Sequence, residues 1–190
     1  MNRRDALSRV ALLVGGSVIG AELFLNGCKT PDKKAVAGLT FTQDDIAFLN
    51  EMGETILPAT STPGAKEAKV GEFMTVFVND CYEEKDQKIF HEGLLKLDEA
   101  SKKKNSKSFM ESTAEQRHDL LVDLDKEAKD YQKNKKDGDP THYFTMMKQL
   151  TLMGFFTSEP GATKALRYVA IPGRYEGCIP YKKGDKAWAT

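Results

Sequence analysis

The chain has 190 residues, of which 28 are Lys or Arg and 28 are Asp or Glu, so its formal net charge is zero. Nucleic-acid-binding surfaces usually give a chain an excess of basic residues, so this balance argues against nucleic acid as a partner. With 40% hydrophobic and 29% charged residues, the composition is typical of one globular domain and excludes a disordered chain or a membrane protein with many spans.

Residues 1–27 have the organisation of an export signal. Arg3 and Arg4 lie in a short basic segment, and a twelve-residue apolar run from Val10 to Ala21 follows. This run is shorter than the roughly 20 residues that a membrane-spanning helix needs. It is therefore typical of a secretory signal peptide. The adjacent arginines resemble a twin-arginine leader, whose pathway exports folded proteins, and ordinary secretion is the alternative.

The leader ends in Leu25-Asn26-Gly27-Cys28, which resembles a bacterial lipobox. The cysteine of a lipobox receives diacylglycerol, whose acyl chains contribute about 0.8 kcal/mol of membrane binding per buried CH₂. The sequence therefore predicts a mature lipoprotein that begins at Cys28, with residues 28–40 as a tether. A free cysteine beyond a conventional cleavage site is the alternative.

Residues 41–190 are predicted to form one helical domain with a non-regular C-terminal extension. Apolar residues recur at spacings of three and four in successive segments, and capping or turn residues separate these segments. We expect an all-α, irregular bundle of about five to six helices, without a strand pair. The predicted helices run from Thr42 to Pro58, Val70 to about Tyr82, about Glu84 to Lys103, Ser112 to about Gln132, Thr141 to Phe156, and Ser158 to Ala170.

Two helices carry more specific expectations. In the helix that starts at Val70, Cys81 falls on the apolar side of the stripe. The segment from Thr141 to Phe156 is apolar on most of its circumference, so it should be the central and most buried helix. Its methionines are expected to fill the core; they are Met146, Met147 and Met153.

The extension over residues 171–190 has a different composition from the helical part. It contains two prolines, three glycines, two tyrosines, the single tryptophan and Cys178. No helical or alternating pattern fits it, yet it has too many large apolar and aromatic side chains for simple disorder. We therefore expect this segment to lie against something.

The sequence has no pattern of an active site. A Gly-rich dinucleotide fingerprint, a P-loop and a C-x-x-C-H haem motif are all missing from it. The three cysteines do not have the spacing of metal ligands, and His91, His118 and His142 are far from one another in the sequence. We therefore predict no catalytic, cofactor-binding or metal-ligating residue in this chain.

Cys81 and Cys178 leave two interpretations open. If Cys28 carries lipid, these two thiols remain in an oxidising compartment, where a disulfide between them would join the extension to the second helix. Such a bridge would contribute about 2–4 kcal/mol. In the other interpretation Cys81 is a buried core thiol and Cys178 contacts a partner chain.

Several segments together resemble the gluconate 2-dehydrogenase subunit 3 family. The resemblance runs from about Thr42 to Tyr181, and the leader with Arg3 and Arg4 fits it as well. The segments that carry it are Glu54-Thr55-Ile56-Leu57-Pro58, Phe73-Met74, Asn79-Asp80-Cys81-Tyr82, Met153-Gly154-Phe155-Phe156 and Pro172-Gly173-Arg174-Tyr175-Glu176-Gly177-Cys178.

The resemblance implies a small, non-catalytic subunit of a periplasmic, membrane-associated sugar or sugar-acid dehydrogenase. In that family a separate large subunit of the glucose–methanol–choline (GMC) type holds FAD and oxidises the substrate, and electrons commonly pass to a cytochrome c. This chain would then hold no cofactor itself. It would be a membrane-anchored lipoprotein in the periplasm of a Gram-negative bacterium, where it escorts, stabilises and anchors the flavoprotein.

The residues expected to contact the large subunit lie in and just before the extension. They are Tyr168, Ile171, Arg174, Tyr175, Ile179, Tyr181 and Trp188. The alternative function is that of a stand-alone periplasmic lipoprotein that binds a small ligand or an envelope protein in a groove of the bundle.

Overall fold

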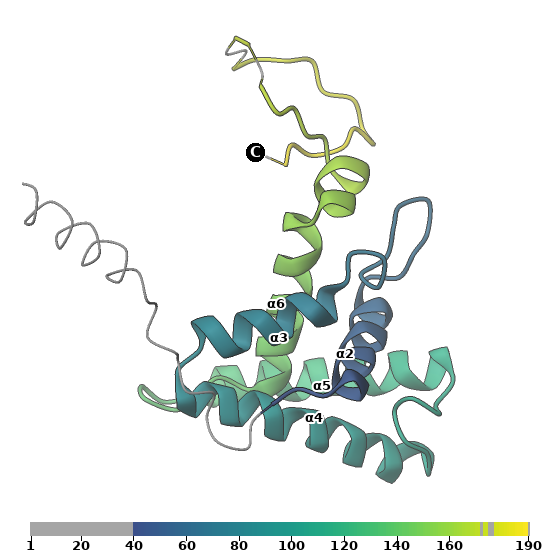
Figure 1. The fold of residues 1–190 in the computed structure, drawn as a ribbon, viewed down its shortest axis with the longest axis vertical. Coiled ribbons are helices and arrows are strands. Elements are labelled where there is room, and N and C mark those ends of the chain that lie inside the picture. Colours follow the sequence, from purple (N-terminus) through teal and green to yellow (C-terminus); the bar gives the residue numbers. More distant parts are fainter. Residues whose placement is uncertain (1–39, 172, 175–176, 190) are drawn as a thin grey trace, which may run out of the picture. The chain divides into compact units, whose positions relative to one another are not determined.

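The computed structural model describes residues 40–171, 173–174 and 177–189. These residues form an all-α bundle (Figure 1), which confirms the predicted fold class. Its elements are α2 (Gln43–Ile56), α3 (Val70–Cys81), α4 (Glu84–Asn105), α5 (Ala114–Asn134), α6 (Tyr143–Thr157) and a π-helical turn, η1 (Gly161–Ala165). The predicted leader, and the predicted tether up to residue 39, lie outside the described residues.

Capping boxes fix the starts of two helices. At α2 the Thr42 hydroxyl accepts the Asp45 N–H at 3.2 Å, and the Asp45 carboxylate accepts the Thr42 N–H at 2.8 Å. At α5 the equivalent pair is Thr113 and Gln116. Each box satisfies amide groups that have no partner within the helix. The helix starts at α2 and α5 are therefore local consequences of the sequence.

The centre of the bundle is α6, which contacts α2, α3, α4 and α5. In Figure 1 it passes between the other helices and leads directly to η1. Its burial confirms the prediction that this helix is the central one. The buried residues of α6 are Tyr143, Phe144, Met146, Met147, Leu150, Thr151, Gly154 and Phe155.

Close contacts at Asn50 of α2 and Gly71 of α3 hold these two helices together. The Asn50 side chain accepts the Gly71 N–H at 2.9 Å and donates to the Glu72 carboxylate at 2.9 Å. A Cβ on Gly71 would lie 2.6 Å from the backbone oxygen of Ile46. Only a residue without a side chain permits this approach of the two helices.

A charged cluster joins α2 to α5, to the loop that follows α2 and to the segment before α5. The Glu51 carboxylate pairs with Lys66, at 2.8 Å, and with Arg117. Arg117 also donates to the carbonyls of Phe109, at 2.9 Å, and Met110, at 2.7 Å. The hydrogen bond from Lys66 and the charge of Arg117 lower the pKa of the Glu51 carboxyl, although its partial burial acts in the opposite direction.

The Glu54 carboxylate holds the loop between α2 and α3. It accepts the N–H of Ala59 and the N–H of Lys66, each at 2.8 Å. Ala65 in this loop is fully buried, and its N–H donates to the Leu57 carbonyl at 2.9 Å. The Glu54-Thr55-Ile56-Leu57-Pro58 segment therefore has a structural role: it ends α2 and folds the following loop onto the core.

Three sequence expectations were wrong. Cys81 is exposed, because it is the last residue of α3 and the buried stripe of that helix ends at Val78. Met153 is 44% exposed, because the covered side of α6 at this point is taken by Gly154, which closely approaches Phe73 of α3, and by the buried Phe155. The last predicted helix ends at Ala165, since Leu166 is extended and Arg167 bonds to the C-terminal segment instead.

In the part of the chain that the structure describes, no helix combines the length and the apolar character that crossing a bilayer requires.

Leu150→Ala and Leu152→Ala should differ sharply in their effect on stability. Leu150 is buried, whereas Leu152, on the same helix, is 37% exposed. We expect Leu150→Ala to lower the free energy of unfolding by about 2–5 kcal/mol, because it leaves a cavity in the core. Leu152→Ala should cost less than about 1 kcal/mol. Urea denaturation of the two variants measures both values, and equal losses would contradict the central position of α6.

Glu51→Gln should destabilise the protein in a pH-dependent way. The folded-state pKa of Glu51 lies below its ordinary value of 4.5, so the charged pair stabilises the protein above that pH and is lost as the pH falls through the folded-state pKa. At pH 7 we expect the free energy of unfolding to fall by about 1.5–3 kcal/mol. Chemical denaturation across the range from neutral to strongly acidic pH should show the difference shrinking.

Glu92→Gln is the matched control for this effect. Glu92 pairs with Lys96 on the exposed surface of α4, at 3.2 Å. Exposed pairs of this kind contribute about 0.3–0.5 kcal/mol. A loss for Glu51→Gln no larger than that of the control would show that the cluster does not hold α2 to its loops.

Candidate partner-docking surface

Two of the three histidines, His91 and His142, are held by local structural contacts. His142 caps α6, since its Nδ1 accepts the Phe144 N–H at 3.2 Å. The ring of His91 stacks on the ring of Phe41, with 4.0 Å between the two ring centres, and burial lowers the pKa of this imidazole. His118 is exposed beside Asp119. Within the described ranges no three His, Cys, Asp or Glu side chains are grouped so that they could hold a metal ion.

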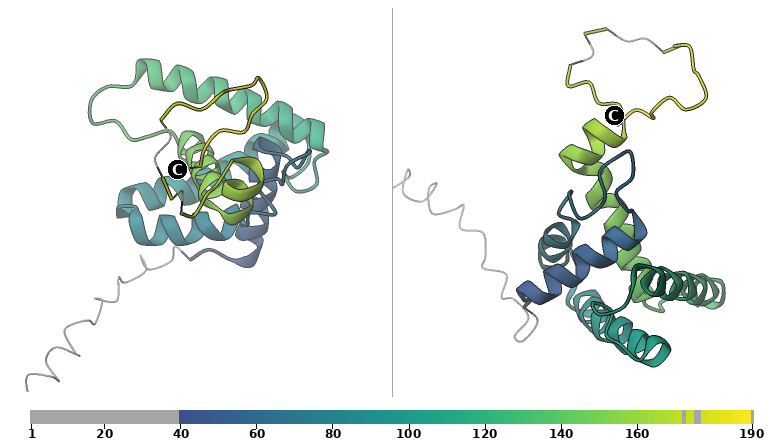
Figure 2. Two further views of the ribbon diagram at one scale, coloured as in Figure 1. Left: turned by 90° about the horizontal axis from the view of Figure 1, so that it is seen from above. Right: turned by 90° about the vertical axis from the view of Figure 1, so that its right-hand side faces the viewer.

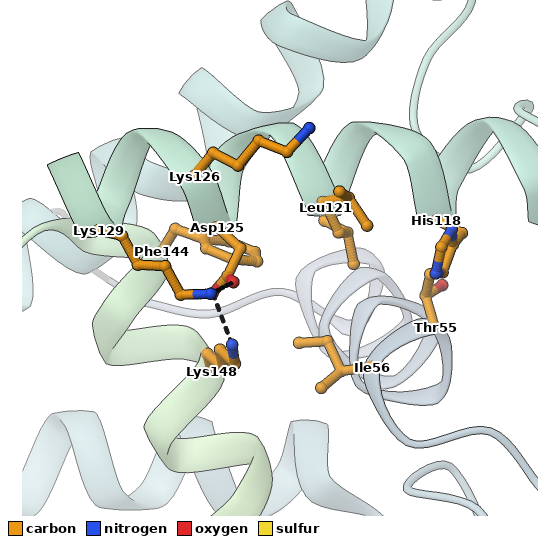
Figure 3. A pocket seen from close by; sticks show the side chains of 10 residues that line it. Thr55, Ile56, His118, Leu121, Asp125, Lys126, Lys129, Phe144 and Lys148 are labelled. Carbon is orange, nitrogen blue, oxygen red and sulfur yellow. Dashed lines mark hydrogen bonds and ion pairs between the residues drawn. The ribbon is translucent and has the colours of Figure 1, made fainter.

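An open hollow of about 320 Å³ lies between α2, α5 and α6 (Figure 3). Its charged side chains are largely paired with one another: the Asp125 carboxylate contacts Lys148 at 2.5 Å and Lys129 at 2.7 Å. The hydrogen bonds from Lys129 and Lys148 lower the pKa of the Asp125 carboxyl. The hollow therefore offers a small apolar surface and little uncompensated charge. Its apolar lining is made of Ile56, Leu121, Val122 and Phe144.

The C-terminal segment folds back on itself in a loop, which we call the C-terminal loop and define by its described residues, 166–171, 173–174 and 177–189. Its two ends pair in parallel at Arg167 and Trp188. The Arg167 N–H donates to Ala187 at 2.8 Å, and the Ala189 N–H donates to the Arg167 carbonyl at 2.9 Å. The Arg167 guanidinium lies 4.0 Å from the centre of the Trp188 ring, a cation–π contact. These contacts form the neck of the loop.

Two further contacts tie the neck to the rest of the chain. The Lys186 ammonium donates to the backbone carbonyl of Lys164 in η1. Lys164 in turn pairs with Glu67, in the loop between α2 and α3, at 2.8 Å. In Figure 1 and in the right-hand view of Figure 2 the C-terminal loop follows η1 and lies away from α4 and α5.

The described residues of the C-terminal loop expose most of the side chains that the sequence predicts as a partner interface. Ile171 is 85% exposed and Tyr181 is 77% exposed. Tyr168, Ile179 and Trp188 are also exposed, as is Arg174. The expectation that this segment lies against something is therefore not met within this chain. Monomeric proteins rarely leave such a series of large apolar side chains in water, so the loop is a candidate docking surface.

Four of the predicted site residues lie outside the part of the chain that the structure describes. Arg3 and Arg4 of the predicted export signal, Cys28 of the predicted lipobox and Tyr175 of the predicted interface lie outside the described residues. Among the described ones, Tyr168, Ile171, Arg174, Ile179, Tyr181 and Trp188 all belong to the C-terminal loop.

Cys81 and Cys178 are both free and exposed. The disulfide that would join the C-terminal extension to α3 is not formed in this structure. Its two cysteines belong to separate features, because Cys81 ends α3 while Cys178 lies in a loop that closes on itself. Cys81 is not a buried core thiol either, so that part of the other interpretation was wrong.

The sequence analysis missed one residue of this loop and one exposed face of the bundle. It did not single out Arg167, whose partner Trp188 is far away in the sequence and linked to it by no local pattern. It also missed the outward face of α6, where Leu152, Met153 and Phe156 are exposed. The spacing of Leu152 and Phe156 is that of helical neighbours, but a helix that is apolar on nearly every side does not show which side stays uncovered.

Comparison with known proteins identifies the family. A family profile described as gluconate 2-dehydrogenase subunit 3 matches residues 43–173, which is more than half of the chain. Searches of curated proteins and of solved structures found no match. The matched range covers all the helices of the bundle and reaches into the C-terminal loop. The chain therefore belongs to the gluconate 2-dehydrogenase subunit 3 family.

Proposed function

We propose that this protein is the non-catalytic small subunit of a periplasmic FAD-dependent sugar or sugar-acid dehydrogenase, whose large GMC-type subunit it escorts, stabilises and anchors. The observation that carries the proposal is the exposed C-terminal loop on a bundle whose core is complete without it. Among the described residues, the last buried apolar side chain of the core is that of Phe155. The loop is therefore not needed to close the core, and its apolar side chains are free for a partner.

The size and type of the exposed side chains favour a protein partner. Binding energy at protein interfaces is concentrated in a few large side chains, among which Trp, Tyr and Arg are enriched. The loop exposes Tyr168, Tyr181 and Trp188. Burial of these rings would supply the affinity that a permanent subunit needs.

The leader gives the subunit a purpose in export. A flavoprotein must fold around FAD before it crosses the membrane, and the twin-arginine pathway carries folded proteins. With Arg3 and Arg4 on the small subunit, the pair would be exported together. Lipid on Cys28 would then hold the pair at the membrane surface, and a cytochrome c would accept the electrons.

A stand-alone lipoprotein that binds a small ligand is the second candidate. The observation that favours it is the open hollow between α2, α5 and α6. Asp125 already pairs with Lys129 and Lys148 there, which leaves little charge to select a ligand. The two candidates differ in the behaviour of the purified chain: the small subunit should be recovered with a large flavoprotein, and the stand-alone protein without one.

Affinity purification from the native host in mild detergent should recover a larger, yellow, flavin-containing protein with this chain. The double variant Ile171→Ser/Tyr181→Ser should recover at least tenfold less of it, because it removes two exposed apolar contacts of about 1 kcal/mol or more each. Flavin absorbance and gel electrophoresis of the eluate measure the yield.

Leu95→Ser serves as the control, since Leu95 is an apolar residue on α4 that is also mostly exposed, at 68%. It should leave the flavoprotein yield unchanged. Recovery of the unmodified chain alone under the same gentle conditions would refute the subunit function.

Replacement of Arg3 and Arg4 by lysine should leave the large flavoprotein in the cytoplasm, because the partner has to be exported with the signal on this chain. Arg9→Lys, outside the arginine pair, should have no effect. Cell fractionation followed by a flavin or dehydrogenase assay measures both. Normal export of the flavoprotein in the Arg3→Lys/Arg4→Lys strain would disprove the escort role and leave the association untouched.

A further inference from the structure

The described chain divides into an acidic bundle and a basic C-terminal part. Residues 40–160 contain 16 basic and 23 acidic residues, a net charge of −7, whereas residues 161–190 contain six basic and two acidic residues, a net charge of +4. The neutral total therefore hides a strong separation of charge. The basic residues of the C-terminal part are Lys164, Arg167, Arg174, Lys182, Lys183 and Lys186.

From this separation we propose that the C-terminal loop recognises an acidic site with an apolar floor on the large flavoprotein subunit, so that charge guides the association and the aromatic side chains complete it. The inference rests on the proposed function and specifies the chemistry of its docking site. Opposite charges on two partners raise the rate of their association and favour one orientation of the complex.

The tip of the loop carries the basic groups that are available to a partner. Lys182 and Lys183 directly follow the exposed Tyr181, and both are exposed. Among the described residues, no ion pair involves either of their ammonium groups. Lysines of the bundle, such as Lys88 and Lys148, are instead paired within the protein. An aromatic ring beside two unpaired cations fits an acidic site with an apolar floor.

A tight turn holds this tip in shape. The Asp185 carboxylate accepts the Lys182 N–H at 2.9 Å, and the Asp185 N–H donates to the Lys182 carbonyl at 3.0 Å. Gly184 has a φ of +97°, which favours glycine at this position. Together with the neck at Arg167 and Trp188, the turn reduces the conformational entropy that the loop would lose on binding.

A protein site explains the surroundings of the loop better than an anionic membrane does. Basic and aromatic residues also bind anionic lipid surfaces. However, Glu67 pairs with Lys164 at the base of the loop, and the adjoining bundle has a net charge of −7. An anionic bilayer would repel both. A partner protein can place its acidic groups at the tip alone.

A second copy of this chain is a less suitable occupant. Its bundle is acidic, but docking of the loop of one copy on the bundle of the next would be a head-to-tail contact. Such a contact forms a ring or an open filament. The flavoprotein is a single, defined partner that satisfies the same charge requirement.

The test measures association of the full-length chain, in mild detergent, with the flavoprotein as the salt concentration is raised. Between about 50 mM and about 500 mM NaCl, we expect the association rate constant of the unmodified chain to fall about tenfold or more. Lys182→Glu/Lys183→Glu should associate about tenfold more slowly at low salt and should lose most of the salt dependence. Lys182→Arg/Lys183→Arg should behave like the unmodified chain.

Lys107→Glu/Lys136→Glu is the matched control. These two lysines are also exposed, lie in loops of the bundle, and give the same change in net charge. The control should retain normal association and normal salt dependence. Thermal unfolding of all variants by circular dichroism verifies that each one is folded.

Four results would overturn the proposal. Salt-independent association with no effect of Lys182→Glu/Lys183→Glu would refute charge recognition and leave the subunit function standing. Failure of the unmodified chain to bind any flavoprotein would refute the subunit function as well. If Lys182→Glu/Lys183→Glu bound the flavoprotein normally but no longer bound phosphatidylcholine vesicles that contain phosphatidylglycerol, the occupant of the loop would be a membrane. If this variant bound the flavoprotein normally but lost self-association, the occupant would be a second copy of this chain.

Discussion

Burial of α6 among α2, α3, α4 and α5 is the constraint on which the rest of the structure depends. The side chains that α6 turns toward the core are almost all apolar. Phe144, Met147, Leu150 and Thr151 are nearly or fully buried. Because η1 and then the C-terminal loop follow α6 in the chain, packing of α6 also decides where the loop emerges (Figure 1).

The polar clusters of the bundle serve this packing. Glu51 and Arg117 connect α2 with α5 and, through the Phe109 carbonyl, with the segment before α5, while Asn50 and Gly71 fix the approach of α2 and α3. Hydrogen bonds to charged groups that are partly shielded from water contribute more than exposed pairs do. Each of these polar and charged side chains has its partners across a contact between two elements.

The core of the bundle and the C-terminal loop are separate features of the fold. The bundle closes its apolar core without the loop, so large side chains such as Ile171 and Tyr181 remain exposed. The loop is nevertheless held in shape by the neck at Arg167 and Trp188. A preformed loop with apolar and basic groups is well suited to a permanent subunit contact, since little order has to be created when the partner binds.

The sequence by itself determined the helices of the bundle, the helix start at Thr42 and the central position of α6, because capping and apolar periodicity act over a few residues. It also pointed to the C-terminal segment through its composition. Only the tertiary structure decided that Cys81 and Met153 are exposed, that Arg167 meets Trp188, and that the loop closes on itself. Those facts depend on which neighbours cover a given face and on pairing between distant residues, and no local pattern records either.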